Sequence, residues 1–376
     1  MRMRLTAAVL AAGGTVAASL GTAVPSEAAT TTPQYRLVLG TVANADYFGI
    51  NSRGDIIGVG TNNADFGRLD GFVILAGSTT PLFLSSPNTA TSLGDDSQPR
   101  SINDQGVIVG TYQKNEILNG QEAMISRPAI WQAGSSVGTD LGVEPAGDGD
   151  AFGINDNGQI VGRQGGRTSI TPWLLNGSTV TNLPPLKGSN DSEVLGENSN
   201  GVAVGEAAVA GGTQIGGNQT ALEWANGKLI TLGQLGGGTW SEARAINTAG
   251  VAVGSAAPAG QSVLNTDAVM FSGGKVIDLN VPRGVNQAHA QATAINTSGV
   301  IVGGDGVFPD LVGLGNGFVY RNGHATELNT LIAPPPDVRL AQASGINDNG
   351  DIVGTAVVTS PDGTENTVGY ELVPIA

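Results

Sequence analysis

The hydrophobic residues of this chain lie in short runs, and a polar turn that reads Asn-x-x-Gly separates many neighbouring runs. Ile precedes this turn in six of its seven copies, Glu197 takes that place in the other copy, and a second glycine follows four residues after the first. An Asn side chain can bond to the backbone two residues further on, and Gly can adopt the positive φ of a type I turn with a bulge. The pattern therefore predicts a β-hairpin in every copy. The seven asparagines are Asn51, Asn103, Asn155, Asn198, Asn247, Asn296 and Asn347, and the second glycines are Gly58, Gly110, Gly162, Gly205, Gly254, Gly303 and Gly354.

Two more strands are predicted after each hairpin. A large side chain 18 to 28 residues after the Asn marks the third strand, and a short turn then leads to a fourth strand that ends in Leu, as in residues 230–232. Each repeat is thus predicted to be a four-stranded antiparallel meander. The large third-strand residues are Ile74, Trp131, Trp173, Trp224, Phe271, Tyr320 and Tyr370.

The spacing of the repeats predicts a closed ring. The asparagines recur every 43 to 52 residues, which is typical of propeller blades. The last copy has room for three strands only, because six residues follow Tyr370, whereas residues 35–40 before the first copy have the pattern of a fourth strand. We therefore predict an all-β fold, a seven-bladed β-propeller over residues 30–376, in which residues 35–40 complete the last blade. An open array would leave two exposed edges.

Residues 1–29 have the pattern of a secretory signal peptide. Arg2 and Arg4 precede an apolar stretch from Leu5 to Val24, and the small residues Ala28 and Ala29 suit a cleavage site. We expect removal of this segment and a secreted, extracellular product that is not anchored in a membrane, because no second apolar stretch approaches the length of a membrane span.

Composition excludes several classes of site. The chain has no cysteine, so disulfides, thiolate metal sites and cysteine nucleophiles are excluded. The net charge of −15 disfavours binding to nucleic acid. The two histidines, His289 and His324, are predicted at opposite ends of the blades and should not converge on one site. We predict no catalytic residue, no metal site and no cofactor, and we expect a monomer.

One polar column stands out in the predicted inner strands. Five residues before each motif Asn, the chain carries a carboxylate or its amide, and these ring residues should surround the top of the channel, opposite the Asn-x-x-Gly turns. They could bind a cation, a basic side chain or a sugar, or each could bond to the backbone of a neighbouring blade. Arg100 and Arg244 are predicted to neutralise ring carboxylates. The ring residues are Asp46, Gln98, Asp150, Glu193, Glu242, Gln291 and Gln342.

The repeat resembles that of a known family. Its fullest copy, Gly-Gln-Leu-Gly-Gly-Gly-Thr-Trp-Ser-Glu-Ala-Arg-Ala-Ile-Asn at residues 233–247, is similar to the HAF repeats of extracellular proteins. The match covers nearly all of the chain after residue 29, although the His-Ala-Phe that names the family is mostly replaced here. With the signal peptide, the acidic charge and the lack of cysteine, the resemblance extends to autolysis-inducing members.

This resemblance implies a function. It implies a non-enzymatic protein that binds a neutral, thermolysin-like metalloprotease, induces its autolysis and is cross-linked through glutamines by transglutaminase. A transglutaminase needs a glutamine in a mobile, exposed segment. We predict Gln34 in an N-terminal tail, Gln113 and Gln121 in the longest top loop, Gln261 and Gln287 as donors, and we expect the inner strand to protect Gln98, Gln291 and Gln342.

Two other functions stay open. The chain could be a carbohydrate-binding or carbohydrate-active propeller, a hydrolase or lyase that uses the ring carboxylates, because paired carboxylates are what glycoside hydrolysis needs. It could also be an interaction module of a cell wall or matrix.

Overall fold

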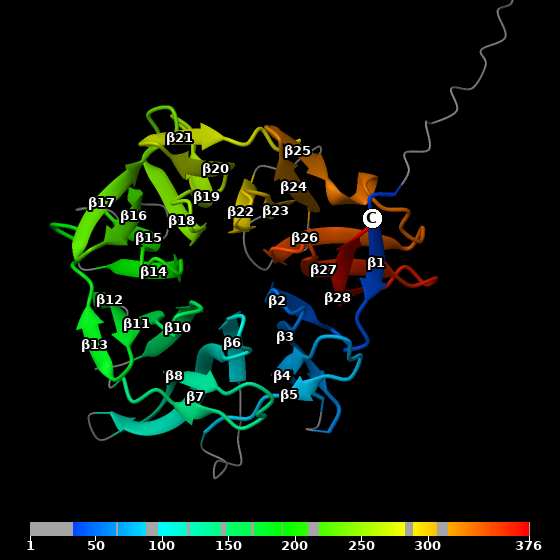
Figure 1. Cartoon of the computed structure of the whole chain (residues 1–376), viewed down its shortest axis with the longest axis horizontal. Helices are drawn as coiled ribbons and strands as arrows, with labels where there is room; N and C mark the ends of the chain where they lie inside the picture. The colour runs from blue at the N-terminus through cyan, green and yellow to red at the C-terminus, as the bar shows by residue number, and fades with distance from the viewer. Residues whose placement is uncertain are drawn as a thin grey trace, which may run out of the picture. The chain divides into compact units, whose positions relative to one another are not determined.

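A computed structural model of the chain describes residues 33–64, 67–87, 97–118, 121–143, 148–166, 169–189, 191–209, 218–282, 289–306 and 315–375. The predicted signal peptide lies outside the described residues. Within them, 28 strands form seven four-stranded antiparallel sheets. Figure 1 shows these sheets as blades around a central opening. The predicted seven-bladed β-propeller is therefore confirmed.

In blades 1 to 6, the strands follow one another in chain order from the innermost to the outermost. Blade 1 comprises β2 (Asp46–Ile50), β3 (Ile56–Asn62), β4 (Arg68–Ile74) and β5 (Leu82–Phe83); blade 2 comprises β6 (Ser97–Ile102), β7 (Ile108–Leu118), β8 (Gln121–Trp131) and β9 (Thr139–Asp140). Blade 3 comprises β10 (Gly149–Ile154), β11 (Ile160–Gly166), β12 (Ser169–Asn176) and β13 (Thr179–Asn182); blade 4 comprises β14 (Ser192–Glu197), β15 (Ala203–Ala208), β16 (Gln219–Ala225) and β17 (Lys228–Gly233). Blade 5 comprises β18 (Trp240–Ile246), β19 (Ala252–Ala257), β20 (Asp267–Ser272) and β21 (Lys275–Asp278); blade 6 comprises β22 (His289–Ile295), β23 (Ile301–Gly306), β24 (Asn316–Arg321) and β25 (His324–Glu327). Blade 7 comprises β26 (Val338–Ile346), β27 (Ile352–Thr359), β28 (Glu365–Pro374) and β1 (Tyr35–Leu39), and the 3-10 helix η1 (Leu328–Thr330) precedes it.

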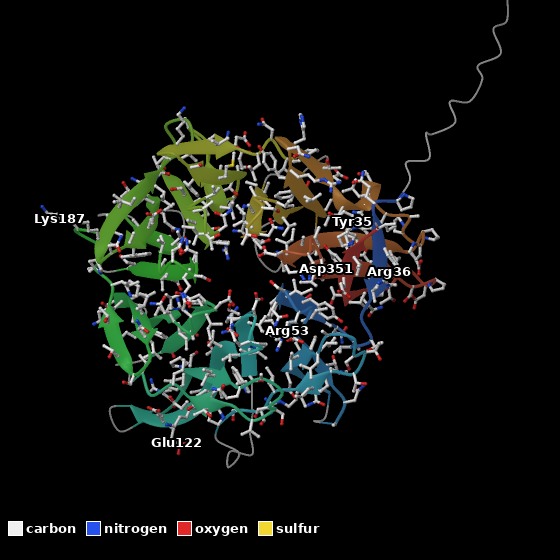
Figure 2. The ribbon with its side chains drawn as sticks, viewed as in Figure 1. Tyr35, Arg36, Arg53, Glu122, Lys187 and Asp351 are labelled. Carbon is white, nitrogen blue, oxygen red and sulfur yellow. The ribbon has the colours of Figure 1, made fainter. Side chains whose placement is uncertain are left out.

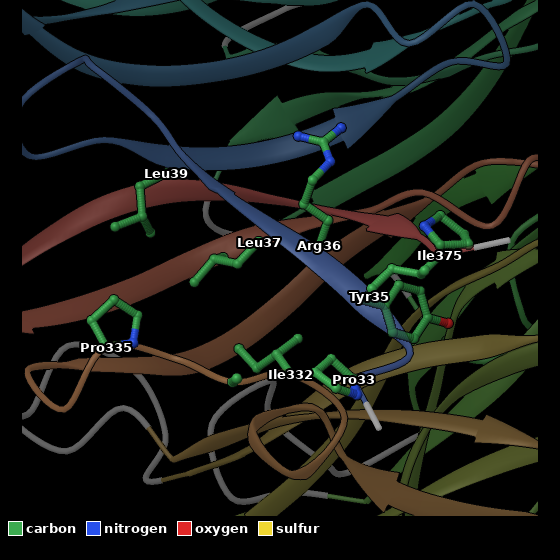
Figure 3. Close-up of a pocket in the computed structure, with 10 residues that line it drawn as sticks. Pro33, Tyr35, Arg36, Leu37, Leu39, Ile332, Pro335 and Ile375 are labelled. Carbon is green, nitrogen blue, oxygen red and sulfur yellow. The ribbon is translucent and has the colours of Figure 1, made fainter. Parts of the chain in front are cut away.

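The ring closes through the start of the described chain, as the sequence predicts. Strand β1 pairs with β28 in antiparallel register, from Tyr35 opposite Pro374 to Leu39 opposite Tyr370. Tyr35 is buried in the apolar core of blade 7, and Leu37 packs against that core. Beside β1 lies a pocket of about 640 Å³, and Leu37, Leu39, Ile332 and Pro335 are among the residues that line it (Figure 3).

The Asn-x-x-Gly turns have the predicted geometry. In every copy, the Asn side-chain oxygen accepts a hydrogen bond from the backbone N–H four residues later. The seven turn glycines have φ between +74° and +89°, which residues with a Cβ rarely adopt. The fourth residue of the turn is therefore glycine in all seven repeats.

The seven large side chains all lie on the third strands, as predicted, but at two different positions of the ladder. Trp131 pairs with the first residue of its second strand, and Trp224 does so too. However, Trp173 pairs with Gly162 and Tyr370 pairs with Gly354, two residues further along the ladder. All four of these side chains are buried, so both positions contribute to the apolar core. In blade 3, the Trp173 ring packs over Gly162, which lacks a side chain.

Candidate functional site

The seven ring residues all lie on the innermost strands, as predicted. They are Asp46 on β2, Gln98 on β6, Asp150 on β10, Glu193 on β14, Glu242 on β18, Gln291 on β22 and Gln342 on β26. Figure 1 shows these seven strands nearest the central opening. A Cβ on the second glycine of each repeat would overlap the backbone carbonyl of the ring residue in the same blade. The glycine thus lets the inner strand approach the second strand closely.

A β-bulge follows the ring residue in every blade, and sequence reasoning missed it. The register between the first and second strands shifts at the same place in all seven sheets. One extra residue is inserted there, two positions after the ring residue, and bulges of this kind re-aim a side chain. We call these the bulge residues: Phe48, Arg100, Phe152, Leu195, Arg244, Thr293 and Ser344.

The ring carboxylates are bonded to neighbouring blades. Thr355 of blade 7 donates its hydroxyl to Asp46 of blade 1, with 2.9 Å between the oxygens. Thr111 of blade 2 does the same to Asp150 of blade 3, also at 2.9 Å. Burial raises the pKa of Asp46, and the bond from Thr355 partly offsets this. The sequence left open a bond from each ring residue to the neighbouring backbone; for these two carboxylates the partners are side chains of the neighbouring blade.

Arg163 connects blades 3 and 4. Its Nε lies 2.7 Å from a carboxylate oxygen of Asp150, and its Nη1 lies 2.6 Å from Glu193. Its guanidinium also lies 5.4 Å from the centre of the Phe152 ring. Burial raises the pKa of Glu193, and the charge of Arg163 opposes that rise. Sequence reasoning missed Arg163 because it lies on the second strand, although register places it opposite Asp150.

Blades 4 to 6 meet around Glu242. Its carboxylate accepts hydrogen bonds from Arg244 Nε at 2.8 Å, from Ser255 Oγ at 2.9 Å and from the Gln291 amide. Burial opposes ionisation, but the charge of Arg244 and the hydrogen bonds from Arg244, Ser255 and Glu206 hold the pKa of Glu242 below its usual range. Burial, followed by the charges of Glu242 and Glu193, raises the pKa of Glu206 well above the usual range. The side chains of Glu206 and Glu242 also share a hydrogen bond, which favours the protonated form of Glu206.

The ring amides differ from the carboxylates. Gln98 is exposed, and its side-chain oxygen accepts a bond of 3.1 Å from Arg100 Nη2. Gln342 is half-buried, and its backbone carbonyl accepts the Tyr370 hydroxyl at 3.0 Å. Arg244 thus neutralises a ring carboxylate, as predicted, whereas Arg100 bonds to an amide.

At the opposite end of the channel, the motif asparagines form a closed circle of hydrogen bonds. Each side-chain Nδ2 donates to the backbone carbonyl of the motif Asn in the next blade. We call this circle the asparagine belt: Asn51 to Asn103 (3.0 Å), Asn103 to Asn155 (3.2 Å), Asn155 to Asn198 (3.1 Å), Asn198 to Asn247 (2.9 Å), Asn247 to Asn296 (3.2 Å), Asn296 to Asn347 (3.1 Å) and Asn347 to Asn51 (3.1 Å). It borders a cavity of about 200 Å³.

The sequence contained a signal for the belt that we did not use. The turn alone needs only a side-chain acceptor, which Asp also supplies. Yet the position is Asn in all seven copies and never Asp. Unlike an ionised carboxylate, an amide can accept bonds within the turn and also donate one outside it.

The candidate donor glutamines lie in different surroundings. Gln34 does not begin a free tail, because its N–H donates to the Leu331 carbonyl and its own carbonyl accepts from Ile375. Gln113 and Gln121 belong to the paired strands β7 and β8, so the predicted loop is mostly a hairpin. Gln113 is half-buried, and its amide nitrogen lies 3.2 Å from Ser126 Oγ. Gln261 is exposed, next to a turn, and Gln287 lies outside the described residues.

The histidines occupy separate elements. His289 begins β22, where its Nδ1 contacts the Thr266 hydroxyl, and His324 begins β25 on another part of blade 6. The described residues contain no cluster of three or more His, Asp or Glu residues arranged to hold a metal ion. None of the helical segments in the described part of the chain has the length and apolarity needed to cross a membrane.

Comparisons with known proteins support the fold. No family model and no curated protein matches the chain. Among solved structures, U3-55K is similar over 92% of this chain and 100% of its own, with 10% identity and a TM-score of 0.53. YCF48 bound to D1 peptide matches over 92% of this chain and 96% of its own, with 11% identity and a TM-score of 0.46.

TolB from Acinetobacter baumannii is also similar, with 9% identity, a TM-score of 0.43 and a match over 87% of this chain. The match spans 63% of the TolB chain. At these identities the similarities concern the fold alone.

Proposed function

We propose that the chain is a secreted, non-enzymatic propeller that binds a neutral, thermolysin-like metalloprotease and induces its autolysis. The proposal follows the resemblance to HAF-repeat proteins, and in particular to the dispase autolysis-inducing proteins. The observation that carries it is the bonding of the ring carboxylates. Asp46, Asp150, Glu193 and Glu242 all receive bonds or ion pairs from a neighbouring blade, which favours a scaffold that acts through its surface.

Two mechanisms of autolysis induction can be distinguished. Thermolysin-like proteases are protected from self-digestion by bound calcium, so a partner could either bind the protease directly or remove its calcium. Calcium needs six to eight oxygen ligands, whereas the ring supplies one side chain per blade. Arg163 already pairs with Asp150 and Glu193. We therefore favour direct binding.

The experiment incubates the purified protein with a neutral metalloprotease and follows the intact protease and its activity with time. Serum albumin at equal mass controls for a general substrate effect, and a parallel series contains excess calcium. We expect faster loss of intact protease with the propeller, also in excess calcium. An unchanged rate of loss would refute the proposal, and full protection by calcium would refute direct binding.

We also propose that transglutaminase uses this protein as a glutamine donor. The chain has many glutamines but only four lysines, Lys114, Lys187, Lys228 and Lys275. In the cross-linking reaction, the protein is therefore better suited to supply the glutamine side chain than the lysine amine. Incorporation of a fluorescent primary amine by transglutaminase tests this role, and the absence of incorporation would refute it.

One observation favours the alternative of a carbohydrate-active propeller. The pKa of Glu206 is raised and that of the neighbouring Glu242 is lowered, and such divergent shifts are typical of acid–base pairs. However, the two carboxyl groups of glycosidases stand about 5–9.5 Å apart, whereas these two share a hydrogen bond. Reducing-end release from a polysaccharide panel, abolished by Glu242→Gln, would support this alternative over the first.

A further inference from the structure

Arg100 occupies an unusual place on the channel wall. It is the bulge residue of β6, the innermost strand of blade 2, yet it is exposed. Strand β6 is one of the seven strands nearest the central opening (Figure 1), which places Arg100 at the wall of the channel. Its one hydrogen bond within the described residues is donated to the Gln98 side chain, at 3.1 Å. The guanidinium carries five N–H donors, so most of them are available to a ligand.

The other two arginines of this region are already paired. Arg163 bridges two carboxylates, and Arg244 donates to both oxygens of Glu242. In the described part of the chain, Arg100 has no carboxylate partner of its own. Although the side chain reaches solvent, the surrounding channel wall desolvates it in part and lowers its pKa. The charges of Asp150 and Glu193 oppose this shift, and those of Arg163 and Arg244 add to it. Arg100 is thus a cation near Asp150 and Glu193 that forms no direct ion pair among the described residues.

The fold does not need a cation at this position. The same bulge position holds Phe48, Phe152, Leu195, Thr293 and Ser344 in five other blades, and in blade 5 it holds Arg244, which is paired with Glu242. The bulge forms in all seven blades with these different residues. An arginine at this place therefore adds a property that the architecture does not require.

The neighbours of Arg100 indicate what it would bind. Phe48 and Phe152 occupy the equivalent positions in the two adjacent blades and are half-buried. An apolar environment strengthens a bond between a guanidinium and a carboxylate, because fewer water molecules compete for it. A ligand that fits all three side chains carries a carboxylate with apolar groups on either side of it.

We propose that the mouth of the channel is a binding site for an acidic side chain of a polypeptide, with Arg100 as its anchor and the Phe48 and Phe152 side chains against apolar residues that flank the acid. The apolar flanks favour a peptide over an acidic saccharide. The site is independent of the proposed protease interaction, since any polypeptide with this local chemistry would satisfy it.

The test uses the whole protein and three probes. One is a blocked pentapeptide with a glutamate between two leucines, the second replaces that glutamate with glutamine, and the third is trigalacturonate. Calorimetric titration should give binding of the glutamate peptide, with affinity about tenfold lower for the glutamine peptide, the scale of one charge-assisted hydrogen bond. A higher salt concentration should weaken the binding of the glutamate peptide and leave that of the glutamine peptide unchanged.

Two variants localise the binding. Arg100→Gln should lower the affinity for the glutamate peptide about tenfold, as expected for a charged hydrogen bond. Arg36→Gln, the matched control, removes the same charge from an exposed residue on the outermost strand of blade 7 (Figure 2) and should leave affinity unchanged. Thermal denaturation checks that both variants are folded.

Several results would overturn the proposal. These are equal affinity for the two peptides, unchanged binding after Arg100→Gln, no binding of the glutamate peptide, or preference for trigalacturonate. Because no protease is present, the outcome is separate from that of the autolysis experiment.

Discussion

At the scale of single residues, the motif asparagine shows why one amide recurs in every blade. In blade 5, the Asn247 side-chain oxygen accepts N–H groups from Ala249 and Val251, which shapes the turn. Its Nδ2 donates to the Asn296 carbonyl of blade 6. The same side chain thus fixes a local turn and joins two blades, so local structure and ring assembly depend on one functional group.

Replacing this amide by a carboxylate separates the two roles. Asn247→Asp keeps both acceptor bonds but loses the donor, so a buried carbonyl loses its partner and faces a negative charge. We expect a loss of about 1–3 kcal/mol in the free energy of unfolding at pH 7, the cost of an unsatisfied buried group. Urea denaturation measures this. Below the pKa of the new carboxyl, its O–H can donate again, so the loss should shrink at low pH.

A turn asparagine outside the belt provides the control. Asn226 is exposed in the turn between β16 and β17 with φ of +52°, a conformation that Asp also tolerates. Asn226→Asp should change stability by less than about 0.5 kcal/mol. Equal losses for the two variants would mean that the inter-blade bond contributes nothing.

Glu197 is a second residue whose environment predicts a measurable effect. It stands where six other repeats have Ile, and burial raises its pKa to about 8. One of its oxygens accepts a bond of 3.2 Å from Asn155, and the other has no partner in the described residues. The folded protein therefore binds the Glu197 proton more tightly than the unfolded chain does.

The sign of the pH dependence follows from linkage. A raised carboxyl pKa stabilises the fold fully below the unfolded value of 4.5, and this stabilisation is lost as the pH rises toward about 8. Glu197→Gln should make the melting temperature fall less steeply between pH 5 and pH 8. Glu197→Ile should in addition raise stability by about 1–3 kcal/mol, because it removes an unsatisfied buried oxygen.

The control for Glu197 is the exposed Glu365. Glu365→Gln should leave the slope of melting temperature against pH unchanged. Parallel slopes for the parent and Glu197→Gln would contradict the buried, neutral state of this side chain.

At the scale of secondary-structure elements, prediction succeeded where residue type decides the backbone. The hairpins and ring closure followed from Asn, Gly and the spacing of apolar runs. The bulges did not, because a bulge needs only an extra residue and accepts Phe, Arg, Leu, Thr or Ser. The partners of the ring carboxylates were also missed, since Thr111 and Arg163 reach them from neighbouring strands and blades. Such contacts depend on the register between paired strands and on how neighbouring blades pack, and the sequence of a single repeat does not reveal either.

The closing strand gives the prediction for this scale. A chain that begins after Gly40 loses β1, which exposes the edge of β28 and removes Tyr35 from the core of blade 7. We expect a melting temperature several degrees lower, as for any loss of a few kcal/mol in a large domain. Adding a peptide of residues 33–40 should restore it in a concentration-dependent way. A chain that begins at Pro33 is the control and should keep the pairing of β1. A chain lacking β1 that melts like this control would contradict the role of β1.

At the scale of the whole molecule, the ring is joined at both ends of the channel by different chemistry. The asparagine belt uses neutral amides and is identical in every blade. The top ring uses carboxylates, arginines and hydroxyls in combinations that vary from blade to blade. The uniform end is suited to closure, whereas the variable end has room for specific binding, as at Arg100.

For the proposed role as a glutamine donor, the same architecture predicts an order of reactivity among the glutamines. The enzyme must take a glutamine with several flanking residues into its cleft, which requires a segment that can leave its place in the fold. Gln261 is exposed and belongs to no strand. Gln113 lies in the β7–β8 ladder, and the Gln34 backbone is bonded on both sides. We expect Gln261 to react before Gln113 and Gln34, and Gln291 to react last because it bonds to Glu242.

Peptide mapping after brief incorporation of a labelled amine measures this order. Gln261→Asn retains an amide but shortens the side chain, and it should remove the earliest labelled peptide, whereas Gln113→Asn should leave it in place. If Gln291 or Gln342 were labelled first, the inner strands would have to open before the outer connections do. That order would contradict a ring whose inner strands are held at both ends of the channel. It would mean that the blades open more readily than the segments that connect them.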